Sequence, residues 1–266
     1  MRYSFLLSLC LLLVPAKALA FGSIGHQQVC DLAYQLVQPI TKQQIDALLA
    51  IGPEQQFAKG CVWPDEVRRE PAYQFTAAFH YLNVPRQQQQ LKTTDCAAKG
   101  CLLSAIQHYG ALLKQDGQTR QRAEALLFYS HFIADLHQPL HVSYADDQGG
   151  NKTALYYFGQ PWNLHGVWDS AMLKSLGYPG NSQLAADKLA KLQATAVKRW
   201  QSGQPLVWAQ QSLEQTRRIY REYKPGMLFS QKELDRDGPV IEQRLLQASV
   251  RLAWQLDQLL QPATGN

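Results

Sequence analysis

Beyond its first 20 residues, the sequence lacks a long apolar run, a strong excess of one charge and any Cys-x-x-Cys pair. Without a later apolar stretch of about 18 residues, we expect no membrane anchor. The formal net charge is only +5, which disfavours a protein that coats duplex nucleic acid by neutralising its phosphates. An anionic substrate would therefore need positive charge from a source other than lysine and arginine. Internal repeats and interdomain linkers are also absent, which favours a single domain.

The first 20 residues have the three parts of a secretory signal peptide. Arg2 gives a positive start, residues 5–14 form a short apolar core, and residues 18–20 (Ala-Leu-Ala) form a small-residue cleavage pattern. The alternative is a buried N-terminal helix. Cleavage after Ala20 would remove Arg2 and Lys17, lower the net charge to +3, and leave 246 of the 266 residues as one domain, 21–266. We therefore expect a secreted or periplasmic protein, and a monomer.

Five cysteines are present, and one of them lies in the segment that cleavage would remove. The remaining four are Cys30, Cys61, Cys96 and Cys101. An even number in an exported protein suggests two disulfides. A bridge between Cys96 and Cys101 could close the tight loop between them, which would leave Cys30 with Cys61, although three pairings are formally possible. Zinc binding by cysteines is the weaker alternative.

Apolar residues recur mainly at three- and four-residue steps, as in Leu126, Tyr129, Ile133, Leu136 and Leu140. The same period returns near the end of the chain, over residues 241–259. Further helices are expected at 24–37, 57–69, 72–82, 102–115, 163–175, 183–201 and 206–222, and at another whose N-cap is Thr41. Residues 86–100 are expected to form a surface loop, and residues 154–158 a short strand or hairpin. The prediction is a mainly α fold, a single compact helical domain with a short β-hairpin.

Three of the seven histidines lie in one segment, HFIADLHQPLH at residues 131–141. Because residues four apart share a helix face, His131 and Asp135 can point at one centre. Pro139 should end this helix, so that His141 approaches the same centre from the chain that follows. His137 should face elsewhere, as a structural residue or one that hydrogen-bonds a metal ligand.

The segment NLHGVWD at residues 163–169 repeats this spacing with His165 and Asp169. Zinc takes histidine nitrogen and aspartate oxygen in tetrahedral sites, so two such pairs beside His141 indicate a zinc centre. Helix-surface His–Asp contacts are the alternative. Upstream, Asp65 and His80 are further candidates, although taken singly Asp65 could be a first-turn acid and His80 a core residue.

Five motifs in order along the chain resemble one known family. They are FGSIGH at residues 21–26, WPDEVR at 63–68, HFIADLHQPLH at 131–141, the Gly-Gly-Asn turn at 149–151 and NLHGVWD at 163–169. This order resembles the zinc-dependent, single-strand-specific nucleases of the mung bean type, also known as 3′-nucleotidase/nucleases. The resemblance implies a phospholipase C/nuclease-type fold with three zinc ions at the base of a cleft. It also implies that single-stranded DNA, RNA and nucleotides are the substrates, and 5′-phosphates the products.

The resemblance implies a metal ligand set of histidines, aspartates and main-chain atoms. The first ion would take Asp65, His80, His131 and Asp135; the second His141, His165 and Asp169; the third His26, Asp135 and the main-chain amine and carbonyl of Phe21. Asp135 would thus bridge two ions, with the attacking hydroxide between them. Family members often begin with tryptophan where this chain has Phe21. Signal cleavage would create the free amine at that position.

Further residues are candidates for substrate contact. Arg68 could contact the phosphate, with Asp65 and Asp135 as the other catalytic residues, or it could form a surface ion pair. Tyr81 could stack on a base or be an ordinary helix-flank aromatic. Asn83 stands where eukaryotic members often have an aspartate that contacts the base. Asn151 could position substrate or merely cap its turn.

Two other functions fit parts of this pattern. Bacterial zinc-dependent phospholipases C share the fold and the metal pattern, but the WPDEVR stretch and the Gly-Gly-Asn turn favour a nuclease. An exported, non-enzymatic zinc-binding protein would need no phosphate contact and no aromatic platform. Both remain alternatives to a secreted zinc-dependent endonuclease with 3′-nucleotidase activity.

Overall fold

The computed structural model describes residues 21–260, so the predicted signal peptide at residues 1–20 and the last six residues lie outside the described part. Its elements follow in the order α1 (Gly22–Leu36), α2 (Pro39–Leu49), α3 (Phe57–Gly60), α4 (Trp63–Val67), the 3₁₀ helix η1 (Gln74–His80), β1 (Leu82–Val84), η2 (Thr93–Asp95), α5 (Leu102–Leu113), α6 (Arg120–His137), η3 (Pro139–His141), β2 (Val142–Tyr144), β3 (Ala154–Tyr157), β4 (Gln160–Asn163), α7 (Leu164–Gly166), the π-helical turn η4 (Val167–Ala171), α8 (Met172–Ser175), α9 (Leu184–Ala190), α10 (Ala194–Trp200), α11 (Pro205–Glu222), β5 (Leu228–Phe229) and α12 (Gln231–Leu259).

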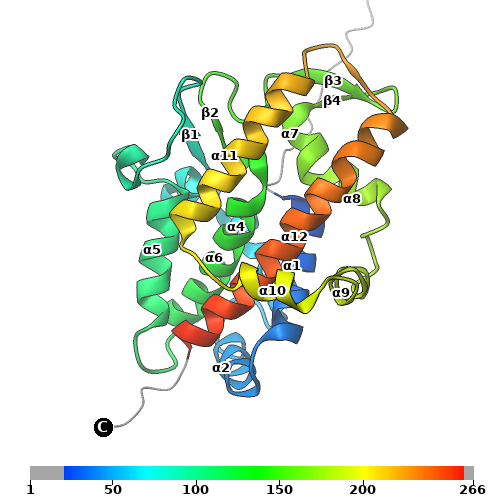
Figure 1. The fold of residues 1–266 in the computed structure, drawn as a ribbon. Helices are drawn as coiled ribbons and strands as arrows, with labels where there is room; N and C mark the ends of the chain where they lie inside the picture. Colours follow the sequence, from blue (N-terminus) through cyan, green and yellow to red (C-terminus); the bar gives the residue numbers. More distant parts are fainter. Residues whose placement is uncertain (1–20, 261–266) are drawn as a thin grey trace, which may run out of the picture.

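Helix α6 lies at the centre of the fold, where it packs against α1, α2, α5, α11 and α12 (Figure 1). Every residue from Ala125 to His137 is buried, so the helix contacts its neighbours on all sides rather than along one stripe. The buried apolar side chains of the described residues form one cluster, to which Trp168 and Trp208 contribute the largest rings. The mainly α fold is confirmed. Within residues 21–260, no helix combines the length and apolar character needed to cross a bilayer.

The start of α2 differs from the prediction. Thr41 is not its N-cap, because the helix begins two residues earlier at Pro39, with Gln38 before it. Proline suits the first turn, since its φ is already near the helical value and its missing N–H would have had no partner there. Thr41 is buried inside the helix instead.

Three other expected helices are shorter or interrupted. Residues 57–69 form α3 and α4, because Pro64 cannot donate to the preceding turn and starts a new helix. Residues 183–201 form α9 and α10 with a break between them. In the 72–82 segment the helix η1 ends at His80, and Leu82 belongs to β1 because it pairs with Val142 of β2. Such a long-range pairing leaves no mark in local periodicity.

The predicted hairpin is confirmed, and the structure has three further strands, one of which joins the hairpin. β3 pairs with β4 in antiparallel orientation, and β5 pairs with β3 in parallel orientation. β1 and β2 form a separate parallel pair in which Asn83 lies opposite Ser143. This pair holds the chain that follows His80 beside the chain that follows His141.

Both expected disulfides are confirmed. Cys30 of α1 is bonded to Cys61, at the end of α3, and Cys96 is bonded to Cys101. The first bridge closes a separation of 31 residues and the second a separation of 5. The long bridge joins α1 to the junction between α3 and α4, directly before the helix that contains Asp65.

Candidate metal centre

The last turns of α6 carry the first pair of candidate ligands. His131 Nε2 lies 3.2 Å from Asp135 Oδ2, at the i, i+4 spacing that the sequence suggested. The helix ends at His137, and Pro139 begins the short 3₁₀ turn η3. This turn brings His141 back, so that its Nδ1 lies 3.3 Å from Asp135 Oδ1.

The second pair lies where α7 passes into a π-helical turn. His165 Nε2 is 3.0 Å from Asp169 Oδ2, and His141 Nε2 is 3.5 Å from Asp169 Oδ1. Asn163 caps this helix by accepting a hydrogen bond from the Gly166 amide at 2.7 Å. The turn that follows is wider than an α-helix, as π turns at functional sites often are.

Residues from three earlier segments complete the cluster. His80 Nδ1 lies 3.5 Å from Asp65 Oδ1 and 3.3 Å from Asp135 Oδ2. His26 of α1 places Nε2 3.3 Å from Asp135 Oδ1. The structure therefore brings together all eight side chains that the sequence suggested as ligands, in three groups: His26, His131 and Asp135; Asp65, His80 and His131; and His141, His165 and Asp169. Within each group the candidate ligand atoms lie within 4.8 Å of one another.

Main-chain carbonyls orient three of the histidines. The Nδ1 atoms of His131, His141 and His165 lie 2.7 Å from the carbonyls of Cys61, His80 and Gly149, respectively. A ring whose Nδ1–H is donated in this way presents a neutral Nε2, which is the usual arrangement around a protein-bound metal.

The Gly-Gly-Asn turn is explained by one of these contacts. Gly149 has a φ of +65°, and a Cβ at this position would lie 2.5 Å from the carbonyl oxygen of Leu140 and 3.4 Å from His165 Nδ1. Only glycine lets the backbone approach His165 this closely in that conformation.

The donor set fits a metal. Buried side-chain atoms without a hydrogen-bond partner include Asp65 Oδ2, both carboxylate oxygens of Asp135, and the Nε2 atoms of His26, His80 and His141. Buried polar atoms normally have partners, and buried carboxylates need a positive counterpart. Imidazole nitrogen and carboxylate oxygen at this density form the ligand type that zinc takes.

The local electrostatics keep the carboxylates ionised. Burial disfavours the charged form of Asp169, but His165 and His141 outweigh it and hold the pKa at about 2. For Asp135, burial acts in the same sense, yet His131 and His141 keep the pKa well below its ordinary value. Burial also opposes a charge on His141, but Asp135 and Asp169 raise the pKa of that imidazole to about 9. For Asp135 and Asp169, therefore, the attraction of the histidines for the carboxylate exceeds the cost of burying its charge.

A pocket of about 550 Å³ opens onto this cluster. Arg68, Tyr81, Asn83 and Asn151, the four suggested substrate contacts, all line it, together with His80, His141 and His165. Arg68 Nη1 lies 3.0 Å from Asp65 Oδ1, so the suggested ion pair exists, but within the pocket wall. Asn151 Nδ2 donates to the Gln148 carbonyl at 2.8 Å and so caps its turn.

Phe21, the expected first residue of the mature chain, lies beside His26. It is fully buried, its ring centroid is 6.3 Å from that of His26, and its carbonyl accepts a hydrogen bond from the Gly25 amide at 3.1 Å. Its φ of +34° is unusual for a residue other than glycine. The side chain thus packs in the core while the backbone starts α1 next to a candidate ligand.

One polar residue was missed in the sequence, and another takes the structural one of its two suggested roles. Gln138 is fully buried and donates to Asp169 Oδ1, while its Oε1 accepts from the Leu140 amide at 2.5 Å. His137 faces away from the cluster, as expected, but it contacts no candidate ligand: its Nδ1 lies 2.7 Å from the Ile133 carbonyl and its Nε2 lies 2.9 Å from Arg251. Only the position of Gln138 directly after the ligand helix could have drawn attention to it.

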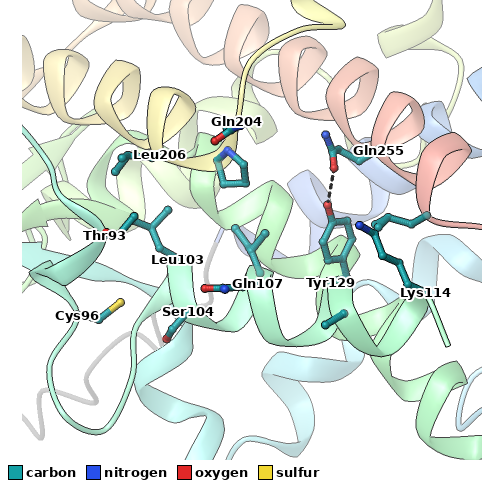
Figure 2. A pocket seen from close by; sticks show the side chains of 15 residues that line it. Thr93, Cys96, Leu103, Ser104, Gln107, Lys114, Tyr129, Gln204, Leu206 and Gln255 are labelled. Carbon is teal, nitrogen blue, oxygen red and sulfur yellow. Dashed lines mark hydrogen bonds between the residues drawn. The ribbon is translucent and has the colours of Figure 1, made fainter.

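A second cavity, of about 580 Å³, lies between α5, Tyr129 of α6 and the facing parts of α11 and α12. Figure 2 shows its lining, with the hydrogen bond between Tyr129 and Gln255. Histidine, aspartate and glutamate are absent from the described residues that line it, so it offers no metal ligands. The chemistry belongs to the His/Asp cluster.

Comparison with known proteins identifies relatives over almost the whole described chain. The family model described as S1/P1 Nuclease matches residues 21–261. Endonuclease 3 of Arabidopsis thaliana is 31% identical over 265 residues, covering 91% of this chain and 90% of its own length. Nuclease S1 of Aspergillus oryzae is 27% identical, with 89% and 91% covered, and Nuclease P1 of Penicillium citrinum is 32% identical, with 69% and 68% covered.

Proposed function

Because the chain belongs to the S1/P1 nuclease family, we propose that its eight converging side chains hold three zinc ions that serve the cleavage of single-stranded nucleic acid. The family makes the protein a hydrolase of phosphodiester bonds that leaves 5′-phosphates. The observation that carries the zinc assignment is the set of buried, unpartnered imidazole nitrogens and carboxylate oxygens. Activity on 3′-nucleotides and export as a secreted or periplasmic protein are parts of the same proposal.

The proposed ligand sets combine the same side chains, with Asp135 shared by two sets and the main chain of Phe21 added to one. Asp65, His80, His131 and Asp135 would hold one ion, His141, His165 and Asp169 a second, and His26, Asp135 and the main chain of Phe21 a third. When bound, zinc supplies a Lewis acid for phosphate oxygens and lowers the pKa of a water to about 7. The residues around it then have the tasks of binding and orienting the substrate.

Arg68 supplies a positive charge at the pocket wall. Its guanidinium is held at 3.0 Å by Asp65, which fixes it beside the ligands rather than in open solvent. From there it can contact the substrate phosphate and the negative charge that develops during cleavage. Asp65 therefore has two tasks, to bind metal and to orient Arg68.

Tyr81 and Asn83 fit the recognition of an unpaired base. Tyr81 lines the pocket and is 37% exposed, so it is accessible for base stacking, worth about 1–3 kcal/mol per base. Asn83 Oδ1 is buried without a hydrogen-bond partner, and an amide can both accept from and donate to a base edge. A single strand can place its base here, whereas a base within a duplex is already stacked and paired.

The test is cleavage by the purified mature protein. Single-stranded DNA, single-stranded RNA, duplex DNA, a 3′-nucleotide and phosphatidylcholine would each be incubated with and without a chelator. We expect chelator-sensitive cleavage of both single strands and about three zinc ions per chain. Hydrolysis of the lipid alone, or cleavage that survives complete metal removal, would disprove the proposal, and one zinc per chain would disprove the ligand sets.

A further inference from the structure

One arginine near the pocket rim packs against two aromatic rings that also contact each other, with ring centroids 4.9 Å apart. Arg86 follows β1, and its guanidinium carbon lies 4.7 Å from the ring centroids of both Tyr144 and Tyr220. Tyr144 ends β2 and Tyr220 lies in α11, so three separate elements build the arrangement. Stacking of this kind limits the motion of a long side chain and suits arginine more than lysine.

The rings are themselves fixed. The Tyr220 hydroxyl donates to Asp147 Oδ2 at 2.6 Å, and the same oxygen accepts from the Thr153 hydroxyl at 2.8 Å. Tyr144 pairs with Val84 in the parallel β1–β2 pair. Arg86 is therefore positioned before any ligand arrives, which reduces the ordering cost of binding.

The outer edge of Arg86 faces solvent. Its side chain is 45% exposed, and its Nε donates to Asp146 Oδ2 at 2.6 Å. Among the described residues, no acceptor is recorded for its two Nη groups, so they can donate to a ligand. Asp146 is itself 60% exposed, so this carboxylate can turn away from Arg86 without losing a buried contact.

The cluster is continuous with the substrate pocket. Ala145 lines the pocket and directly precedes Asp146, while Asn83 lines it three residues before Arg86. Three residues span at most about 10 Å. Lys152, which follows the pocket residue Asn151, donates through Nζ to the Asp146 carbonyl at 2.9 Å and adds a second cation.

Helix α11 extends the positive surface. Arg217 and Arg221 lie on either side of Tyr220 in α11 at i, i+4 spacing, and Lys224 follows shortly after the helix ends at Glu222. Arg217 fastens the loop after Arg86 through a 2.9 Å hydrogen bond from Nη2 to the Gln88 carbonyl. Arg221 and Lys224 are exposed, and Lys224 Nζ donates to the Tyr220 carbonyl at 2.8 Å.

We propose that Arg86, packed against Tyr144 and Tyr220, binds a backbone phosphate of the single strand beside the cleaved linkage, and that Asp146 pairs with the arginine until the strand arrives. This inference rests on the proposed nuclease function. The site reads no base, because a phosphate contact positions the strand without distinguishing its sequence. It gives longer strands an advantage over a dinucleotide, which has no second phosphate to offer.

Replacing Asp146 and replacing Arg86 should change strand binding in opposite directions. An incoming phosphate must displace this carboxylate, so removing its charge should strengthen binding, whereas removing Arg86 should weaken it. A purely structural role of the pair predicts the same sign for both changes, since either one breaks the ion pair. Opposite effects of the two variants therefore distinguish the binding role.

The experiment compares two substrates on the zinc-loaded enzyme, the dinucleotide dTpdT and a twelve-residue oligothymidylate. Arg86→Ala should raise KM for the long strand about threefold to tenfold, leave kcat unchanged and leave both constants for the dinucleotide unchanged. It should also reduce the slope of log(1/KM) against log[salt] by about 0.7, the loss of one phosphate contact on a single strand. Asp146→Asn should lower KM for the long strand alone.

A matched control is Arg120→Ala, which breaks an exposed Arg–Glu pair at the start of α6, far along the helix from the ligands. It removes the same charge and should leave both substrates unaffected. Equal effects of Arg86→Ala on the two substrates, or a higher KM in Asp146→Asn, would overturn the inference. Failure of the wild-type enzyme to cleave either substrate would instead overturn the proposed function on which it rests.

Discussion

Asp135 is the residue on which the candidate centre depends most. Its two oxygens lie within 3.3 Å of four imidazole nitrogens, from His26, His80, His131 and His141. These histidines come from three of the proposed metal sites, so a change at this one carboxylate alters all of them.

Asp135→Asn keeps the shape of the side chain but removes its charge. We expect loss of at least one zinc per chain and a fall in activity of a hundredfold or more, since a bridging ligand is lost. Metal content by atomic emission and cleavage of a single strand would measure both. The control is Asp237→Asn, a buried carboxylate that pairs with Arg218 and Arg236 instead. It should lower the melting temperature and keep its zinc; full zinc in Asp135→Asn would contradict the bridging role.

Gln138 is a positioning residue for Asp169. Because its amide donates to Oδ1, the other oxygen, Oδ2, is the one that faces His165. Gln138→Met should therefore reduce zinc affinity or activity about 10- to 100-fold, the usual effect of losing a partner that orients a ligand. Zinc retention during titration with a chelator is the direct measurement. Gln193→Met, on the exposed surface, is the control; identical zinc retention in the two variants would refute the assignment.

At the scale of elements, the two disulfides should differ in what they support. Cys61 provides the carbonyl that lies 2.7 Å from His131 Nδ1, so the Cys30–Cys61 bridge holds a ligand as well as a helix. Cys96–Cys101 closes only a short loop.

Replacing Cys30 and Cys61 by serine should cost about 3–4 kcal/mol of unfolding free energy, from the entropy of the long loop, and should weaken zinc retention. The Cys96/Cys101 double serine variant should cost about 2 kcal/mol and keep its zinc. Denaturant unfolding and metal analysis test the two effects separately. Equal zinc loss in both variants would show that the Cys61 carbonyl does not orient His131.

The sequence could predict the elements whose signal is local. The spacing of His131 and Asp135 placed both on one helix face, and Pro139 placed the end of that helix. It could not predict that β1 pairs with β2, because that pairing joins residues about 60 positions apart and depends on tertiary contacts. The π-helical turn at Asp169 and the hydrogen bond from Gln138 to Asp169 could not be predicted from local sequence either. The resemblance to a family, rather than any physical pattern, grouped His26, Asp65 and His80 with the other ligands.

For the whole molecule, metal removal should have a large effect on stability. The core around α6 would retain three buried carboxylates, from Asp65, Asp135 and Asp169, without their metal counterpart. Zinc binds only the folded arrangement, so it stabilises the protein in proportion to the logarithm of its concentration over its Kd. Chelation should lower the melting temperature by 10 °C or more, on the order of several kcal/mol. Scanning calorimetry with and without chelator measures the shift; no shift would contradict a buried zinc centre.

The metal-free protein should also have a defined pH profile. The lowered pKa of Asp169, about 2, contributes stability above the unfolded value near 3.8 that is lost as the pH falls toward 2. The raised pKa of His141, about 9, contributes stability below the unfolded value near 6.5 that is lost as the pH rises toward 9. The contribution of these two groups to the unfolding free energy should therefore be greatest between about pH 4 and 6.5, whereas burial lowers the pKa of His26, His80 and His137, whose contribution favours higher pH. His141→Gln should reduce the decline above pH 6.5, of which His131 contributes another part because its pKa is also raised, and an unchanged decline would contradict the assignment.

The burial of α6 has a consequence for the way the enzyme and its substrate adapt to each other. A helix enclosed on every side is among the last parts of a protein to open, so its amides should exchange with solvent only through nearly global unfolding. Two of the candidate ligands are part of this most rigid element. The centre is then rigid, and the nucleic acid is the partner that must change its conformation when the complex forms. A flexible single strand can bend to meet such a template, whereas a stiff duplex cannot do so without first coming apart.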